Sequence, residues 1–232
     1  MEPALLAERL SRVRETVAAA CDRSGREPGE IGIVAVTKGH PLEVLLAALD
    51  AGLVDVGENR VQEARVKFQA AGASLTRARR HLVGSLQRNK VRDALGLFDW
   101  IQSVDSLRLA DEISTRAADR QKPVDVLVEV NASGEERKRG FPTEEVGDRV
   151  HEIAALPGLR VRGLMTMAPW TDDEAILRRT FRGARRLLDE INQRGSLSLD
   201  TLSMGMSNDY PLAVEEGATM LRLGTALFGP RD

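Results

Sequence analysis

Short apolar runs alternate along the chain with longer segments in which hydrophobic residues recur every three or four positions. A short apolar run is typical of a strand buried on both faces, and the longer period is that of an amphipathic helix. The runs predict eight strands, over residues 31–36, 54–57, 81–84, 100–103, 124–130, 161–165, 201–203 and 220–223.

The segments between the runs predict helices over residues 43–51, 58–71, 86–95, 106–120, 143–155 and 171–194, and a shorter helix after residue 207. The longest shows the helical period most clearly, in the spacing of Leu177, Phe181, Ala184, Leu188 and Ile191. It opens with Thr171 and Glu174, which have the spacing of a capping box. We therefore expect Thr171 to cap this helix.

An alternation of eight strands with helices is typical of a closed (β/α)8 barrel, because closure removes the two exposed edges that an open sheet would leave. An open doubly wound sheet is the alternative fold. An apolar stripe at Leu6, Leu10, Val13 and Val17 predicts an extra helix before the first strand. No linker-like or low-complexity segment divides the 232 residues. We therefore predict one α/β domain over residues 1–232, a single TIM barrel with an extra N-terminal helix.

Charge and composition narrow the classes of partner. The 33 basic and 35 acidic residues give a net charge of −2, which does not favour nucleic acid or an anionic membrane. The single cysteine cannot form an intramolecular disulfide, and no segment reaches the roughly 18 consecutive apolar residues of a membrane helix. We expect a cytoplasmic protein that binds neither nucleic acid nor membrane.

A nucleic-acid module remains an alternative because basic residues cluster in one part of the sequence. Aromatic residues, on which bases would stack, make up only 3% of the chain, which argues against it. The basic residues in question are Arg77, Arg79, Arg80, Arg88, Lys90 and Arg92.

The first predicted strand leads directly to a lysine. In a (β/α)8 barrel the functional residues follow the carboxyl ends of the strands, and Lys38 is the one lysine of five that directly follows a predicted strand. A lysine in the mouth of a barrel is partly desolvated, which favours the neutral amine that attacks a carbonyl group. Lys38 is therefore a candidate for a Schiff base.

Two loops near the end of the sequence predict a phosphate site. Gly224 and Thr225 stand at the start of a short helix, where free backbone N–H groups and a glycine let an anion approach closely. Barrels often bind phosphate there together with the loop after the seventh strand, here residues 203–209. A ligand with both an aldehyde, for Lys38, and a phosphate, for these two loops, would fit this site. Pyridoxal 5′-phosphate (PLP) and the sugar phosphates of a lysine-dependent aldolase both meet this requirement.

Six motifs occur in order along nearly the whole chain, at residues 35–38, 57–63, 81–90, 162–165, 202–207 and 222–229. As a group they resemble the motifs of the pyridoxal phosphate homeostasis proteins, the YggS/PROSC family. This resemblance implies the fold-type III, PLP-binding barrel that also occurs in alanine racemase.

The resemblance further implies that Lys38 carries PLP covalently as a Schiff base and that Arg222 faces the pyridine nitrogen. A guanidinium cannot accept a proton, so it disfavours a protonated ring and makes the ring a poor electron sink. The other implied cofactor-binding residues are Asn59 near the ring, Ser203, Gly224 and Thr225 around the phosphate, and Met206 and Ser207 in the same loop. Accessory candidates are Lys138, which matches a family lysine proposed to help load or release PLP, Met165, and His81, for which a core position is the alternative.

We expect a carrier that hands PLP to apo-enzymes rather than an enzyme. Racemisation of the alanine racemase type needs a second proton-transferring group, a tyrosine from a separate C-terminal domain, and we expect no such domain here. The only tyrosine, Tyr210, is interpreted as a packing or lid residue. A PLP-dependent racemase or decarboxylase of low activity is the alternative. We expect a monomer, and no metal because the three histidines are widely spaced.

Overall fold

The computed structural model describes residues 2–118, 120, 122–134 and 139–230. Eight parallel strands form a closed barrel in which β8 pairs with β1, so the predicted barrel is confirmed and the open sheet is wrong. The strands are β1 (Gly32–Val36), β2 (Asp55–Glu58), β3 (Arg79–Leu82), β4 (Trp100–Val104), β5 (Val124–Glu129), β6 (Leu159–Met165), β7 (Thr201–Ser203) and β8 (Met220–Leu223).

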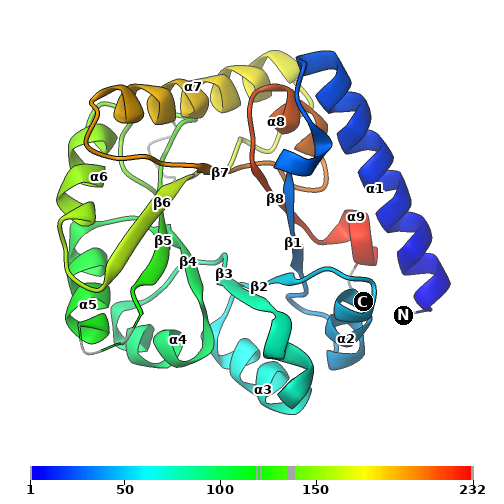
Figure 1. The fold of residues 1–232 in the computed structure, drawn as a ribbon. Helices are drawn as coiled ribbons and strands as arrows, with labels where there is room; N and C mark the ends of the chain where they lie inside the picture. The colour runs from blue at the N-terminus through cyan, green and yellow to red at the C-terminus, as the bar shows by residue number, and fades with distance from the viewer. Residues whose placement is uncertain (1, 119, 121, 135–138, 231–232) are drawn as a thin grey trace.

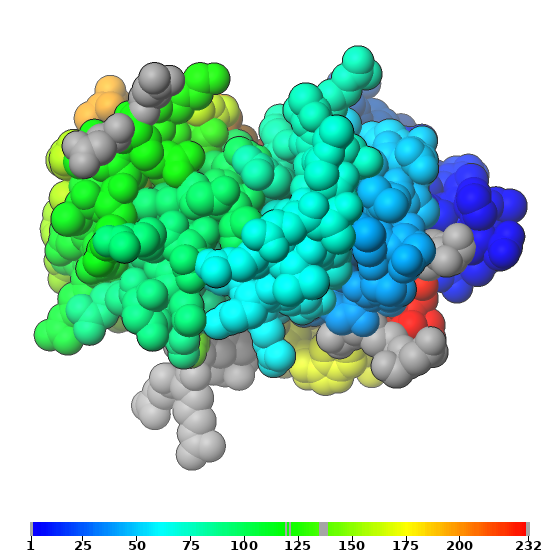
Figure 2. Space-filling model, turned by 90° about the horizontal axis from the view of Figure 1, so that it is seen from below, coloured from blue at the N-terminus to red at the C-terminus, as the bar shows by residue number. Residues whose placement is uncertain are grey.

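Helices cover the outside of the barrel (Figure 1). They are α1 (Pro3–Ser24), α2 (Leu42–Asp50), α3 (Val61–Ala71), α4 (Val91–Leu97), α5 (Leu107–Ala117), α6 (Val146–Ala154), α7 (Glu174–Gln193), α8 (Tyr210–Glu215) and α9 (Thr225–Phe228). The extra helix predicted before the first strand is confirmed as α1, which packs against α8 and α9. Figure 2 shows the molecule from below, where the blue-to-green segments from α2 to α5 lie next to one another and the dark-blue α1 lies at the right edge.

Four helices, α3, α4, α6 and α7, begin three or more residues later than the sequence predicts. Glu58, expected at the start of a helix, belongs to β2 and pairs in register with Leu82, so α3 begins only at Val61. The helix expected from residue 86 begins at Val91 and is preceded by a 3-10 turn over Arg88–Lys90.

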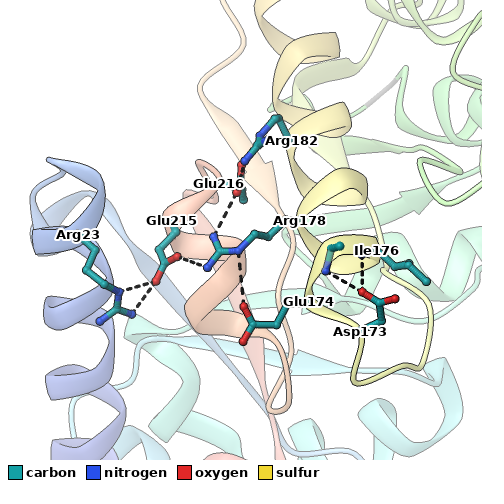
Figure 3. A network of polar contacts seen from close by, with 9 residues as sticks. Arg23, Asp173, Glu174, Ile176, Arg178, Arg182, Glu215 and Glu216 are labelled. Atoms are coloured by element: carbon teal, nitrogen blue, oxygen red, sulfur yellow. Dashed lines mark hydrogen bonds and ion pairs between the residues drawn. The ribbon is translucent and has the colours of Figure 1, made fainter.

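The start of α7 also differs from the prediction, because Asp173 and not Thr171 caps it (Figure 3). One carboxylate oxygen of Asp173 accepts hydrogen bonds from the backbone N–H groups of Ala175 (2.9 Å) and Ile176 (3.3 Å). The Thr171 hydroxyl accepts from the Asp173 N–H at 3.1 Å and so belongs to the turn before the helix. An aspartate immediately before the first turn satisfies the free donors better than a hydroxyl two residues earlier.

The barrel wall separates two cores, because successive side chains of a strand point to opposite faces. Outward-facing residues such as Val56, Ile101 and Leu221 join the large apolar core beneath the helices. A small apolar cluster of Trp100, Leu127 and Met165 forms a second group. The interior also holds Val34 and Val36 of β1 and the buried polar residues Asp55, His81, Gln102, Ser203 and Arg222. This barrel is therefore filled by a mixture of apolar and polar side chains, whereas branched apolar residues alone are usual.

Gly163 allows β6 and β7 to approach closely. A Cβ atom at this position would lie 1.7 Å from the carbonyl oxygen of Thr201, which is far inside contact distance. Only glycine fits there, which explains its place in the motif at residues 162–165.

Candidate functional site

A pocket of about 1160 Å³ opens at the carboxyl ends of the strands. Its walls come from the ends of β1, β2, β5 and β8 and from the loops that follow β5, β6 and β7. Seven residues predicted from the sequence line it, namely Lys38, Asn59, Met206, Ser207, Arg222, Gly224 and Thr225. The structure thus brings together side chains from strands that are far apart in the sequence.

Buried charges hold the backbone on both sides of Lys38. Lys67 of α3 donates from Nζ to the Thr37 carbonyl oxygen at 2.8 Å and to Glu58 Oε1 at 2.6 Å. It also lies 3.2 Å from Glu63 Oε1, which accepts from the Gly39 N–H at 2.5 Å. The residues before and after Lys38 are therefore fixed by one cluster behind the barrel wall, which we call the Lys67 cluster (Thr37, Glu58, Glu63 and Lys67).

Glu58 and Thr37 are the most buried members of the Lys67 cluster, with no exposed surface. Burial raises the pKa of the Glu58 carboxyl group, and the hydrogen bonds from Lys67 and Thr37 offset this only in part. Within the described residues the Glu58 Oε2 atom has no hydrogen-bond partner. Sequence analysis missed this cluster, although Glu58 and Glu63 lie in one motif and Glu63 and Lys67 have the helical i, i+4 spacing.

The loop after β7 and the start of α9 are joined directly. The Ser207 hydroxyl accepts a hydrogen bond from the Ala226 N–H at 3.0 Å, and Asp209 accepts from the Met206 N–H at 2.6 Å. Gly224 precedes α9 and is the acceptor of the first turn, from the Phe228 N–H at 2.8 Å. The two loops predicted to hold a phosphate therefore meet on one side of the pocket.

Arg222 lies at the floor of the pocket and is 6% exposed. Its guanidinium donates to Ser203 Oγ at 2.6 Å and to the Thr166 carbonyl oxygen at 2.9 Å. Burial lowers the pKa of Arg222 to about 10, although the nearby carboxylates of Asp209 and Glu129 oppose this. Ser203, expected beside the phosphate, is fully buried beneath Arg222 and is not part of the pocket lining.

Glu129 is a pocket residue that the sequence did not indicate. It ends β5, four strands from β1 in the closed barrel, and so faces the pocket from the side opposite Lys38. Burial and the neighbouring Asp105 raise the pKa of Glu129 to about 7, against the opposing effect of Arg222 and Arg139. The only sequence signal was an acidic residue at an inward-facing position of an apolar run.

Two of the accessory candidates, Met165 and His81, are not part of the pocket lining. Met165 is buried in the apolar cluster of the barrel interior. His81 is buried as well, hydrogen-bonded to Asp55 and Gln102 and stacked on Trp100. Lys138 lies outside the described residues.

An ion-pair network forms the outer wall of the pocket, where α1, α7 and α8 meet (Figure 3). Glu215 of α8 binds Arg23 of α1 and Arg178 of α7, each at 2.6 Å. Glu216 binds Arg178 at 3.2 Å and Arg182 at 2.8 Å. Burial would raise the pKa of Glu215, but hydrogen bonds from Arg178 and Arg23 outweigh it and lower that pKa. The network ties three helices together beside the loops that carry Ser207 and Thr225.

Other kinds of site are less well supported by the described residues. No helix among them is long and apolar enough to cross a membrane, and no three His, Cys, Asp or Glu side chains are grouped to hold a metal ion. Of the basic residues considered for nucleic acid, Arg79 is paired with Asp55 and Arg80 with Asp99.

Comparison with known proteins agrees with the motifs. The model of the family "Alanine racemase, N-terminal domain" matches residues 9–232. The pyridoxal phosphate homeostasis protein of Aquifex aeolicus is 42% identical over 224 residues, covering 97% of each chain. The solved structure of PipY from Synechococcus elongatus, with PLP bound, is 36% identical with a TM-score of 0.84, over 97% of this chain and all of that one. A structure from Bifidobacterium adolescentis is 38% identical with a TM-score of 0.91, over 97% and 95% of the two chains.

The resemblance seen in the sequence motifs is thereby confirmed, since the similarity extends over nearly the full length of the relatives. The chain belongs to the alanine racemase N-terminal domain family and, within it, to the pyridoxal phosphate homeostasis proteins.

Proposed function

We propose that this protein binds PLP covalently through Lys38 and serves PLP homeostasis by passing the cofactor to apo-enzymes. The observation that carries the proposal is the convergence of Lys38, Arg222 and the Gly224–Thr225 turn on one pocket. PipY, which is similar over 97% of this chain, was solved with PLP bound, and this supports PLP as the ligand.

The residues present fit such a ligand. Lys38 supplies a half-buried amine, and the Lys67 cluster fixes the backbone on both sides of it. Ser207 and Thr225 offer hydroxyl groups beside a flexible glycine, which suits a phosphate. Bound PLP supplies the aldehyde for a Schiff base and a ring able to withdraw electrons.

Arg222 favours a role as a PLP carrier rather than as a catalyst. It lines the pocket as a buried cation, held by Ser203 and the Thr166 carbonyl. The family resemblance implies that the ring nitrogen lies beside it. A guanidinium donates hydrogen bonds but does not accept a proton, so it keeps that nitrogen unprotonated and limits carbanion chemistry.

The test is the absorption spectrum of the protein with added PLP. We expect a Schiff-base band that is lost in Lys38→Ala and kept in Lys122→Ala, a matched control at an exposed lysine. Borohydride reduction followed by mass spectrometry should place the modified residue at Lys38. An unchanged band in Lys38→Ala, or reduction at another lysine, contradicts the proposal.

Transfer to apo-enzymes is tested separately. We expect the PLP-loaded protein to restore activity to an apo-aminotransferase, and to do so faster than the same amount of PLP released through a dialysis membrane. Equal rates would mean simple release into solution.

We also propose that the chain is a single domain, acts in the cytoplasm and is a monomer. Sedimentation at several concentrations tests the monomeric state.

A weak racemase is the second candidate, and Glu129 is the observation that favours it. A carboxyl group with a pKa near 7, facing Lys38 across the pocket, could exchange protons at neutral pH. Tyr210 is buried in the main core and is not part of the pocket lining. Solvent deuterium entering Cα of amino acids at a useful rate, and lost in Glu129→Gln, would establish this activity and contradict the carrier-only function.

A further inference from the structure

A chain of hydrogen bonds crosses the barrel interior from the floor of the pocket to the opposite end of β2. Arg222 NH1 lies 2.6 Å from Ser203 Oγ, which lies 2.7 Å from Gln102 Oε1. Gln102 Nε2 lies 3.0 Å from His81 Nδ1, and His81 Nε2 lies 2.9 Å from Asp55 Oδ1. We call these five residues the interior chain. They come from β8, β7, β4, β3 and β2, and each is at most 6% exposed.

The chemistry of the two ends fixes the direction of every bond in the interior chain. Arg222 only donates, so Ser203 must accept from it and give its single proton to Gln102 Oε1. The amide nitrogen of Gln102 then donates to His81 Nδ1.

His81, whose Nδ1 accepts, carries its proton on Nε2 and donates it to the carboxylate of Asp55. Turning the Gln102 amide round would leave the Ser203 proton without an acceptor, because Arg222 cannot accept. One assignment satisfies all five groups.

The geometry around the interior chain holds its middle members in place. Trp100 stacks on His81 with ring centroids 5.4 Å apart. The Gln102 amide also donates to Met220 Sδ at 3.2 Å. The chain therefore links a buried cation to a buried carboxylate through three neutral groups, each of which accepts one bond and donates the next. Bonds aligned in this way polarise and strengthen one another at low dielectric.

The charges at the two ends match this arrangement. No carboxylate of the described part of the chain is ion-paired with Arg222, although the guanidinium is buried. Asp55 sits at the far end, where burial would raise its pKa but hydrogen bonds from His81 and Arg79 outweigh burial and lower it. Asp209 and Glu129 are the carboxylates that act on Arg222 through space. The interior chain adds an aligned row of hydrogen bonds that runs from Arg222 to the Asp55 carboxylate.

We propose that Gln102, His81 and Asp55 are positioning residues for the PLP site, acting through Ser203 to hold the Arg222 guanidinium toward the ligand. This inference rests on the proposed function, since Arg222 is placed beside the PLP ring. It extends the binding site from the mouth of the barrel to the start of β2. Residues at that end then affect ligand binding although they do not line the pocket.

The first test compares Gln102→Met with Ser103→Ala. Ser103 is a matched control, because it is also buried on β4 and donates one hydrogen bond, to the Gly84 carbonyl at 2.7 Å, but is not in the interior chain. Affinity is measured for PLP and for pyridoxine 5′-phosphate, which has no aldehyde. We expect Gln102→Met to weaken both by about tenfold, because Ser203 loses its buried acceptor and no longer holds Arg222 in one orientation, and Ser103→Ala to stay within about twofold of wild type.

A second measurement, 15N NMR of His81 in the protein without ligand, tests the bond directions themselves. The wild type should show a neutral ring with the proton on Nε2. Gln102→Glu accepts from Ser203 but cannot donate to His81, so His81 should take up a second proton between two carboxylates. A wild-type proton on Nδ1, or a singly protonated His81 in Gln102→Glu, overturns the assignment.

The outcomes separate this inference from the proposed function. If the wild type binds neither compound, the proposed function fails and this inference fails with it. If the wild type binds both and Gln102→Met binds them as tightly, or Ser103→Ala is weakened equally, only the positioning role is refuted.

Discussion

Replacing Lys67 by methionine should be among the most damaging single changes in this protein. Methionine keeps the length and apolar stem of lysine but removes the amine that contacts the Thr37 carbonyl, Glu58 and Glu63. The Glu58 carboxylate then stays fully buried with the Thr37 hydroxyl, at 2.6 Å, as its remaining donor.

The magnitude follows from the burial of both partners, Lys67 being 6% exposed and Glu58 not at all. Removing one member of such a pair leaves an uncompensated charge and costs about 3–5 kcal/mol. This is a large part of the roughly 5–15 kcal/mol by which native domains are stable. The same change releases the Thr37 carbonyl before Lys38 and removes the amine beside Glu63, the acceptor of the Gly39 N–H, so PLP binding should weaken as well.

The assay is urea unfolding of the wild type, Lys67→Met, Glu58→Gln and the double variant. Glutamine cannot carry the stranded charge, so the double variant should recover most of the loss, and the two changes should not be additive. Lys122→Met, at an exposed lysine, is the control and should change stability by less than about 0.5 kcal/mol.

The pH dependence has a defined sign. Glu58 already has a raised pKa in the folded state, and loss of Lys67 removes one of the groups that lower it. The folded variant then binds a proton more readily than the unfolded chain, so Lys67→Met should regain stability relative to wild type as the pH falls. A loss below about 1 kcal/mol at pH 7, or additive effects in the double variant, would refute the reasoning.

Three further changes have definite expected outcomes. In the folded protein the pKa of Glu129 is raised from 4.5 to about 7. The unfolding free energy of the wild type should therefore fall by up to about 3 kcal/mol as the pH rises from 4.5 to 7. Urea titrations of Glu129→Gln across that range should lack this fall. Asp173→Ala should cost about 1 kcal/mol of unfolding free energy because the α7 cap is lost, whereas an equal loss in Thr171→Ala would contradict the observed cap. Gly163→Ala should lower the melting temperature or prevent folding, since its Cβ would overlap the Thr201 carbonyl oxygen; a wild-type melting curve would disprove that contact.

The periodicity of the sequence predicted the eight strands along the chain because a parallel strand buried on both faces consists of a run of apolar residues. It was less informative at element ends: Glu58 ends β2 although the predicted helix began there, and Asp173 rather than Thr171 caps α7. The candidate site was predicted better. The place of Lys38 after the first strand and the motif resemblance, which also indicated Arg222, pointed to two residues that do line the pocket.

The residues that support the pocket could not be predicted in the same way. Gln102 and His81 stand within runs that predict a filled apolar core, and their partners come from other strands. Lys67 looks like an ordinary residue on the exposed face of a helix until α3 packs behind β1 and β2. Their roles depend on contacts between distant parts of the sequence, which a local pattern does not contain.

The two helices that follow β7 and β8 are only six and four residues long, too short to shield those strands by themselves. The 22-residue α1 lies across both and completes the outer layer where the barrel closes (Figure 1). Deleting α1 would therefore expose the outer side of β7 and β8, the strands that carry Ser203 and Arg222. Because α1 covers these strands from outside and contributes Arg23 to the pocket lining, shortened versions of this protein should lose ligand and solubility together.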